Sequence, residues 1–180
     1  MLTGGAVIGG QVFLATGCNS SDTAALGGAT FAAQDIAFLD EVGETILPKT
    51  KTPGAKDAEV GKFMTVMVND CYNEADQKTF HEGIGKLNEA CKKAHNHGFM
   101  EATPEQRKEL LTALDKEAKD FQKSKKPEES AHYFTMMKQL TLTGFFTSKV
   151  GATEALRYLA VPGRYDGNVP YTKGEKAWAT

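Results

Sequence analysis

The sequence has few of the residues that metal clusters, covalent haem or membrane spans require. Its 180 residues include three cysteines, Cys18, Cys71 and Cys91. Three thiolates are too few for an iron–sulfur cluster or a zinc ion held by four cysteines. No Cys-x-x-Cys-His motif is present, which excludes the usual attachment of a c-type haem. No run of ~18 uncharged apolar residues occurs, so the sequence predicts no transmembrane helix.

The sequence also lacks a large excess of either positive or negative charge. The chain has 21 basic and 23 acidic residues, and its formal net charge is -2. A nucleic-acid partner requires a basic surface, so we expect none. With 41% hydrophobic and 24% charged residues, the composition is that of a soluble globular protein. The length fits one domain.

Basic residues are absent from the first 48 positions, since the first is Lys49. Residues 1–30 combine an apolar run with small residues, which resembles a secretory signal followed by a tether. The stretch from Leu14 to Cys18 resembles a bacterial lipobox, which predicts lipidation of Cys18. Because the expected basic segment is missing, we expect that Met1 is not the natural start and that a basic, twin-arginine type segment precedes it. The alternative is an unstructured tail with an incidental cysteine.

Helical periodicity begins after the leader and predicts one all-α domain over residues 31–180, a bundle of about five helices. Alternating strand patterns are nearly absent. The expected apolar faces are Ile36, Leu39, Val42 and Ile46; Val60, Phe63, Met67 and Cys71; Phe80, Ile84, Leu87 and Cys91; Leu110, Leu111, Leu114 and Phe121; and Tyr133, Phe134, Met137, Leu140 and Phe145.

Capping residues predict where these helices start. We expect Thr30 and Asn73 to be N-caps, and Thr103 followed by Pro104 and Gln106 is a full start signal with a capping box. The charged stretch 123–129 contains a proline and predicts a linker. The fifth helix is expected over roughly 129–147.

An irregular C-terminal arm, rich in proline, glycine and aromatic residues, begins near Val161. Its composition is incompatible with a helix. Tyr165, Tyr171 and Trp178, together with Arg164, are of the residue types enriched at interface hot spots. They also suit the alternative role of sealing the core of the bundle, and the sequence leaves both open.

Two cysteines lie on expected core faces, Cys71 on the second helix and Cys91 on the third. In an oxidising envelope they could form a disulfide that joins the two helices. The alternative is a pair of buried free thiols that pack as small hydrophobic groups.

Candidate catalytic and metal-binding motifs are weak. His95 and His97 lie where the third helix should end, and positive side chains there interact favourably with the helix dipole. Glu129 and His132 form a single Glu-x-x-His, whereas a di-iron site in a helical bundle needs two such motifs and two further glutamates. No Gly-x-Ser-x-Gly is present. We therefore expect no catalytic, cofactor-binding or metal-binding residue in this chain.

Three stretches together carry a resemblance to a known family. The first stretch is residues 38–58, which contains Phe38-Leu39-Asp40-Glu41-Val42 and Thr52-Pro53-Gly54. The second is Gly144-Phe145-Phe146-Thr147-Ser148 together with Gly151. The third runs from Leu156-Arg157-Tyr158 through Pro162-Gly163-Arg164-Tyr165-Asp166-Gly167 to Trp178. Over residues ~31–180 the chain resembles the gluconate 2-dehydrogenase subunit 3 family, the small subunits of bacterial membrane-associated sugar dehydrogenases.

The resemblance implies a partner that does the chemistry. This partner is a large flavoprotein of the glucose–methanol–choline (GMC) oxidoreductase type, which holds FAD and passes electrons to a cytochrome c subunit, a haem c protein, or to quinone. The small subunit binds no cofactor, and it stabilises the flavoprotein and assists its twin-arginine export to the periplasm. The expected interface residues are Phe145, Phe146, Arg164, Tyr165, Tyr171 and Trp178.

Two other functions fit the sequence less well. One is a stand-alone envelope lipoprotein, attached to the membrane only through a lipid on Cys18. The other is a metal-dependent helical-bundle enzyme that uses Glu129, His132 and nearby acidic residues.

Overall fold

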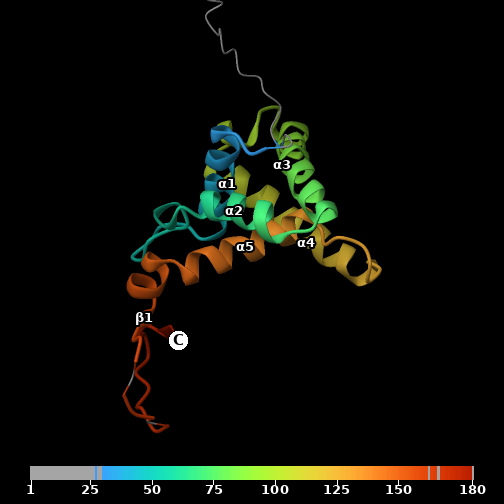
Figure 1. Cartoon of the computed structure of the whole chain (residues 1–180). Helices are drawn as coiled ribbons and strands as arrows, with labels where there is room; N and C mark the ends of the chain where they lie inside the picture. The colour runs from blue at the N-terminus through green and yellow to red at the C-terminus, as the bar shows by residue number, and fades with distance from the viewer. Residues whose placement is uncertain (1–26, 28–29, 162, 166, 180) are drawn as a thin grey trace, which may run out of the picture.

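The computed structural model describes residue 27 and residues 30–161, 163–165 and 167–179 (Figure 1). The expected leader over residues 1–30, with Cys18, lies outside the described residues except for residues 27 and 30. Secretion and lipidation of Cys18 therefore stay predictions.

Five α-helices form the described fold, and the all-α prediction is confirmed. Their bounds are α1 Ala33–Ile46, α2 Val60–Cys71, α3 Glu74–His95, α4 Pro104–Ser124 and α5 Tyr133–Thr147. Shorter elements are the 3-10 turns η1 Lys56–Ala58 and η2 Phe99–Glu101, the π-helical turn η3 Gly151–Ala155, and the strands β1 Arg157–Tyr158 and β2 Trp178–Ala179.

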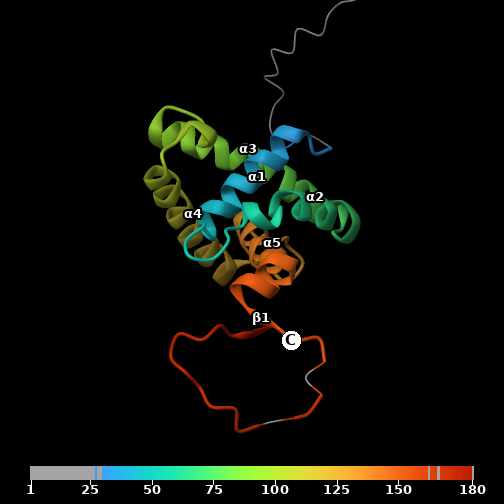
Figure 2. The ribbon, with the colours of Figure 1, turned by 90° about the vertical axis from the view of Figure 1, so that its left-hand side faces the viewer.

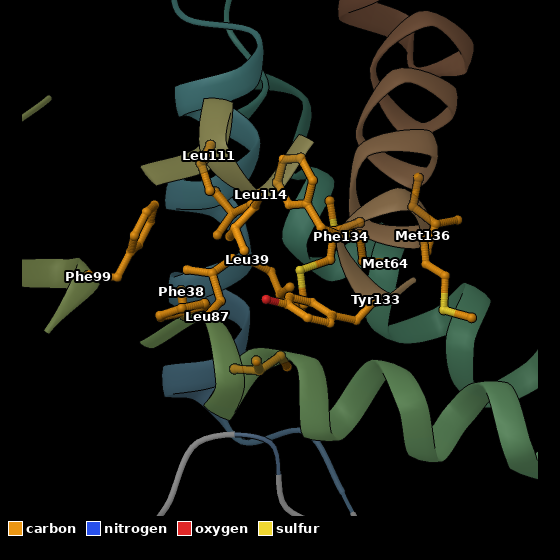
Figure 3. Close-up of a cluster of buried hydrophobic side chains, with 14 of the residues drawn as sticks. Phe38, Leu39, Met64, Leu87, Phe99, Leu111, Leu114, Tyr133, Phe134 and Met136 are labelled. Carbon is orange, nitrogen blue, oxygen red and sulfur yellow. The ribbon is translucent and has the colours of Figure 1, made fainter. Parts of the chain in front are cut away.

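Helix α5 is the centre of the bundle, because it contacts each of the other four α-helices. Its buried residues share one broad face that covers about half of the helix, while Gln139, Leu142 and Phe146 on the opposite side are exposed. Figure 3 shows its side chain Phe134 near Met64 and Leu39 in the core. Among the described residues, no helix is both long and apolar enough to cross a membrane.

Two of the predicted helix starts are confirmed and one is wrong. The side chain of Asn73 accepts a hydrogen bond from the amide of Asp76, and Thr103 forms the predicted capping box with Gln106. Thr30 is exposed and does not cap α1. Asp35 performs that task from inside the helix, since its buried carboxylate accepts the amide protons of Gly27 and Ala32 at 3.0 and 2.8 Å.

Two of the predicted faces need correction. Helix α2 buries Val60, Met64 and Val68, so its buried stripe is rotated by one position from the expected one, and Cys71 is exposed. Phe121 on α4 is 36% exposed and lies against the ring of His132 rather than in the core. The fifth helix starts at Tyr133, four residues later than expected, with His132 as its N-cap.

Candidate functional site

The most exposed group of aromatic side chains lies on residues 157–179, which we call the arm. It begins at Arg157, four residues before the expected Val161, directly after the turn η3. At the end of α5, the Ser148 hydroxyl donates to the carbonyl of Phe145 at 2.7 Å and accepts the amide proton of Gly151 at 2.9 Å. These bonds end the helix and direct the chain away from the bundle.

Both ends of the arm are joined. Strands β1 and β2 pair in parallel, with Arg157 opposite Trp178 and Tyr158 opposite Ala179. The Arg157 guanidinium lies 3.9 Å from the centre of the Trp178 ring and forms an ion pair with Glu175 at 3.2 Å. We call Arg157, Glu175 and Trp178 the clasp. Because the clasp joins residues about twenty positions apart, the arm is a closed ring, as Figure 2 shows.

The aromatic residues of the arm do not seal the bundle. Tyr165 is 96% exposed and Tyr171 is 84% exposed, and Arg164 is exposed as well. Of the two roles that the sequence left open for them, the geometry excludes burial in the core for both tyrosines. Trp178 has a third role, since its ring packs on Arg157 while about half of it stays exposed.

The two adjacent phenylalanines at the end of α5 differ in environment. Phe145 is buried in the core, so it is not available to a partner surface, and that part of the interface prediction is wrong. Phe146 is 41% exposed, and its ring meets that of Phe145 edge to face at 5.1 Å. Of these two phenylalanines, therefore, Phe146 is accessible at the surface and Phe145 is not.

A second group of polar residues joins α1, η1, η2 and α4 beneath the surface. Glu41 forms ion pairs with both Lys56 and Arg107. The Arg107 guanidinium also donates to the carbonyls of Phe99 at 2.9 Å and Met100 at 2.8 Å. Sequence reasoning missed this network, because Glu41 and Arg107 are 66 positions apart and no local spacing links them. Its role is to hold elements together, since each of these groups already has a protein partner.

Comparison with known families decides which proteins this chain resembles. The family model described as gluconate 2-dehydrogenase subunit 3 matches residues 33–163, from the first residue of α1 into the arm. The chain belongs to the gluconate 2-dehydrogenase subunit 3 family. No curated protein and no solved structure matches it. The family name denotes one subunit of a dehydrogenase complex, which implies a catalytic partner.

The family match includes all five helices of this subunit 3 chain but only the first part of the arm. Arg164, Tyr165, Tyr171 and Trp178 follow the matched residues. The match therefore supports the helical bundle as a family property. The description of the arm after residue 163 depends only on the geometry given above.

The two described cysteines of the subunit 3 bundle are free thiols, not the disulfide that the sequence allowed. Cys91 is fully buried on α3, and burial raises the pKa of its thiol. Cys71 is exposed at the last residue of α2. The helix face assigned to α2 was wrong, and for that reason Cys71 does not face the core.

The Glu-x-x-His motif does not form a joint site in this subunit 3 chain. Glu129 precedes α5, and its carboxylate accepts the amide proton of Lys126 at 3.0 Å. His132 instead faces Glu117 on α4, with 3.6 Å between Nε2 and Oε1. Burial lowers the pKa of His132, and the Glu117 carboxylate offsets part of this effect. His132 also accepts the amide proton of Phe134 through Nδ1, so it serves as a helix cap.

His95 and His97 lie on either side of the end of α3, as expected. Asn96 between them has a positive φ of 64° and is the C-cap, and its amide donates to the carbonyl of Lys92. The rings of His95 and His97 stack with centroids 6.1 Å apart. Over the described part of the chain, no cluster of three or more His, Cys, Asp or Glu side chains is arranged to hold a metal ion.

Proposed function

We propose that this chain is the small, non-catalytic subunit of a periplasmic FAD-dependent sugar dehydrogenase. It binds a flavoprotein of the GMC type, stabilises it and assists its export. The oxidation of a sugar, aldonic acid or glycoside takes place on the FAD of that partner, which passes electrons to a cytochrome c subunit or to quinone. None of the described residues of this chain is assigned to the flavin or to haem.

Family membership is the observation that carries this proposal, because it makes the chain a subunit of a dehydrogenase complex. The surface supports it. In one surface hollow the charged lining residues already pair with one another, since Asp115 pairs with Lys119 and Lys138 at 2.7 and 2.6 Å. The largest exposed aromatic side chains lie on the arm, away from these hollows.

Purification from the native envelope tests the proposal. An affinity tag is inserted in the exposed connection between α4 and α5, between Pro127 and Glu128, where it lies away from the arm (Figure 1). We expect the eluate to contain a second, larger chain and to show the visible absorption of an oxidised flavin. Mass spectrometry identifies the larger chain, and sugar-dependent dye reduction shows its activity.

A deletion strain supplies the second measurement. Without this chain, we expect the flavoprotein to be lost or to remain in the cytoplasm, and a plasmid copy of the chain restores it to the envelope. A colourless eluate that holds this chain alone, together with normal dehydrogenase activity in the deletion strain, would contradict the proposal and favour a stand-alone lipoprotein.

A further inference from the structure

We infer that the arm is the element that docks the catalytic subunit, with Tyr165 and Tyr171 as its anchors and the clasp as the device that shapes it before binding. This inference rests on the proposed function. It adds a specific contact surface and excludes the helical bundle as the main one.

The arm has the geometry of a preformed loop. Arg157 contacts both Glu175 and Trp178, and the amide of Arg157 donates to the carbonyl of Ala177 at 2.9 Å. Glycines with positive φ, Gly163 at 74° and Gly174 at 90°, turn the chain on the two sides of the ring. A loop that is already closed loses less conformational entropy on binding than a free tail of the same length.

The exposed side chains of the arm have no role in folding the bundle. Tyr165 and Tyr171 are almost fully exposed, and Val161 between them and the bundle is also exposed. Folding does not favour exposing large apolar groups, whereas tyrosine is enriched at the buried centres of protein interfaces. Figure 2 shows the ring projecting from the end of the bundle, where a second protein has access to both of its sides.

Charge indicates the chemistry of the surface that receives the arm. Residues 157–179 contain four basic and two acidic residues, although the whole chain has a net charge of -2. The fitting partner surface is therefore an acidic recess with apolar walls that accept tyrosine rings. The catalytic subunit is the partner that family membership implies, so we assign the recess to it.

Substitution of the two anchors tests this inference in the full chain. Tyr165→Ser with Tyr171→Ser removes both rings without touching the core. We expect the affinity for the purified flavoprotein, measured by calorimetry, to fall at least about 30-fold, which corresponds to the loss of one hot-spot residue. The matched control is Val66→Ser, which removes a half-exposed apolar side chain from α2, and we expect it to change the affinity less than about 3-fold.

The outcomes separate this inference from the proposed function. If the unaltered chain binds the flavoprotein and the double variant binds equally well, the arm is not the docking element, while the proposed function stands. If the unaltered chain binds no flavoprotein, both fail. Two further results would overturn the inference: self-association of the unaltered chain that the double variant loses, or arm-dependent flotation with phosphatidylethanolamine–phosphatidylglycerol vesicles, each with unchanged flavoprotein binding.

Discussion

Arg107 on α4 pairs with Glu41 on α1 while its remaining guanidinium nitrogens donate to the carbonyls of Phe99 and Met100. Both charged side chains are largely buried, with 13% and 16% of their surface exposed. The pair thus fixes the loop around η2 against two helices. An arginine is required because lysine cannot donate in three directions from one planar group.

We therefore expect Arg107→Met to lower the free energy of unfolding by about 3 kcal/mol, because it leaves the Glu41 carboxylate with one partner fewer in a largely buried position. Urea denaturation followed by circular dichroism measures the change. Arg107→Lys should recover less than half of it. The control is Lys56→Met. The side chain of Lys56 is about half exposed, so its loss should lower the free energy of unfolding by less than about 1 kcal/mol. Equal losses for the two variants would contradict this account.

Acid should weaken the junction between α3 and the segment that leads into α1. The His81 ring stacks on Phe31 at 4.1 Å, and its Nδ1 is buried without a hydrogen-bond partner. Burial lowers the pKa of His81 below its ordinary 6.5, and the nearby Asp35 carboxylate offsets part of this effect. The unfolded chain thus binds more protons than the folded one, so stability is lost as the pH falls below about 6.5.

The measurement is the free energy of unfolding at a series of pH values between 7 and 5. We expect His81→Phe, which keeps the ring stack, to lose less stability over this interval than the unaltered chain. His132→Gln is the comparison, because burial also lowers the pKa of His132. The variant that carries both His81→Phe and His132→Gln should show the smallest dependence of the free energy of unfolding on pH. A slope that neither substitution changes would show that other groups dominate.

The clasp has its own spectroscopic reporter, since Trp178 is the single tryptophan of the chain. We expect Arg157→Gln to increase quenching of Trp178 fluorescence by acrylamide. The loss of a cation–π contact of about 1 kcal/mol would make the population of molecules with an open clasp about 5-fold larger. The unfolding midpoint of the bundle should not move. Lys149→Gln, an exposed charge outside the clasp, should leave quenching unchanged. Unaltered quenching in Arg157→Gln would mean that the clasp does not hold the ring.

Thiol reactivity should distinguish the two described cysteines. In a Cys18→Ser chain, we expect Cys71 to react rapidly with a thiol reagent and Cys91 to react more than about 1000-fold more slowly, because it is fully buried and needs an opening of the fold. Denaturant should make both react at similar rates. A chain that shows no reactive thiol in denaturant until a reductant is added would contain the disulfide after all.

Helix starts were predictable wherever the signal is local. Asn73 and Thr103 bond to amides three positions away, so the residue types alone reveal the caps. The prediction of Thr30 as the cap of α1 was wrong, because the capping carboxylate belongs to Asp35 inside the helix. This carboxylate also accepts the amide proton of the distant Gly27. A local cap is visible in a sequence, whereas one that depends on how the incoming chain folds back is not.

Faces were harder to predict than helices. Helix α2 has apolar residues both at 60, 63 and 67 and at 60, 64 and 68, and only its packing against α1 and α5 selects the second set. Phe145 and Phe146 pose the same difficulty in α5, because apolar residues occur on its exposed face, as Leu142 and Phe146, as well as on its buried face. Composition predicted an irregular aromatic arm, but not the clasp, since two-residue strands about twenty positions apart leave no periodic signal.

The first turn of α1 and the arm lie at opposite ends of the molecule in both views (Figures 1 and 2). A label or surface attachment placed on the first turn of α1 is therefore separated from the ring by the full depth of the helical bundle. A fusion joined directly after Ala179 instead lies beside Tyr158, at the base of the ring. The bundle thus acts as a spacer, and the two ends can be modified independently, one for immobilisation and the other for capture of a second protein.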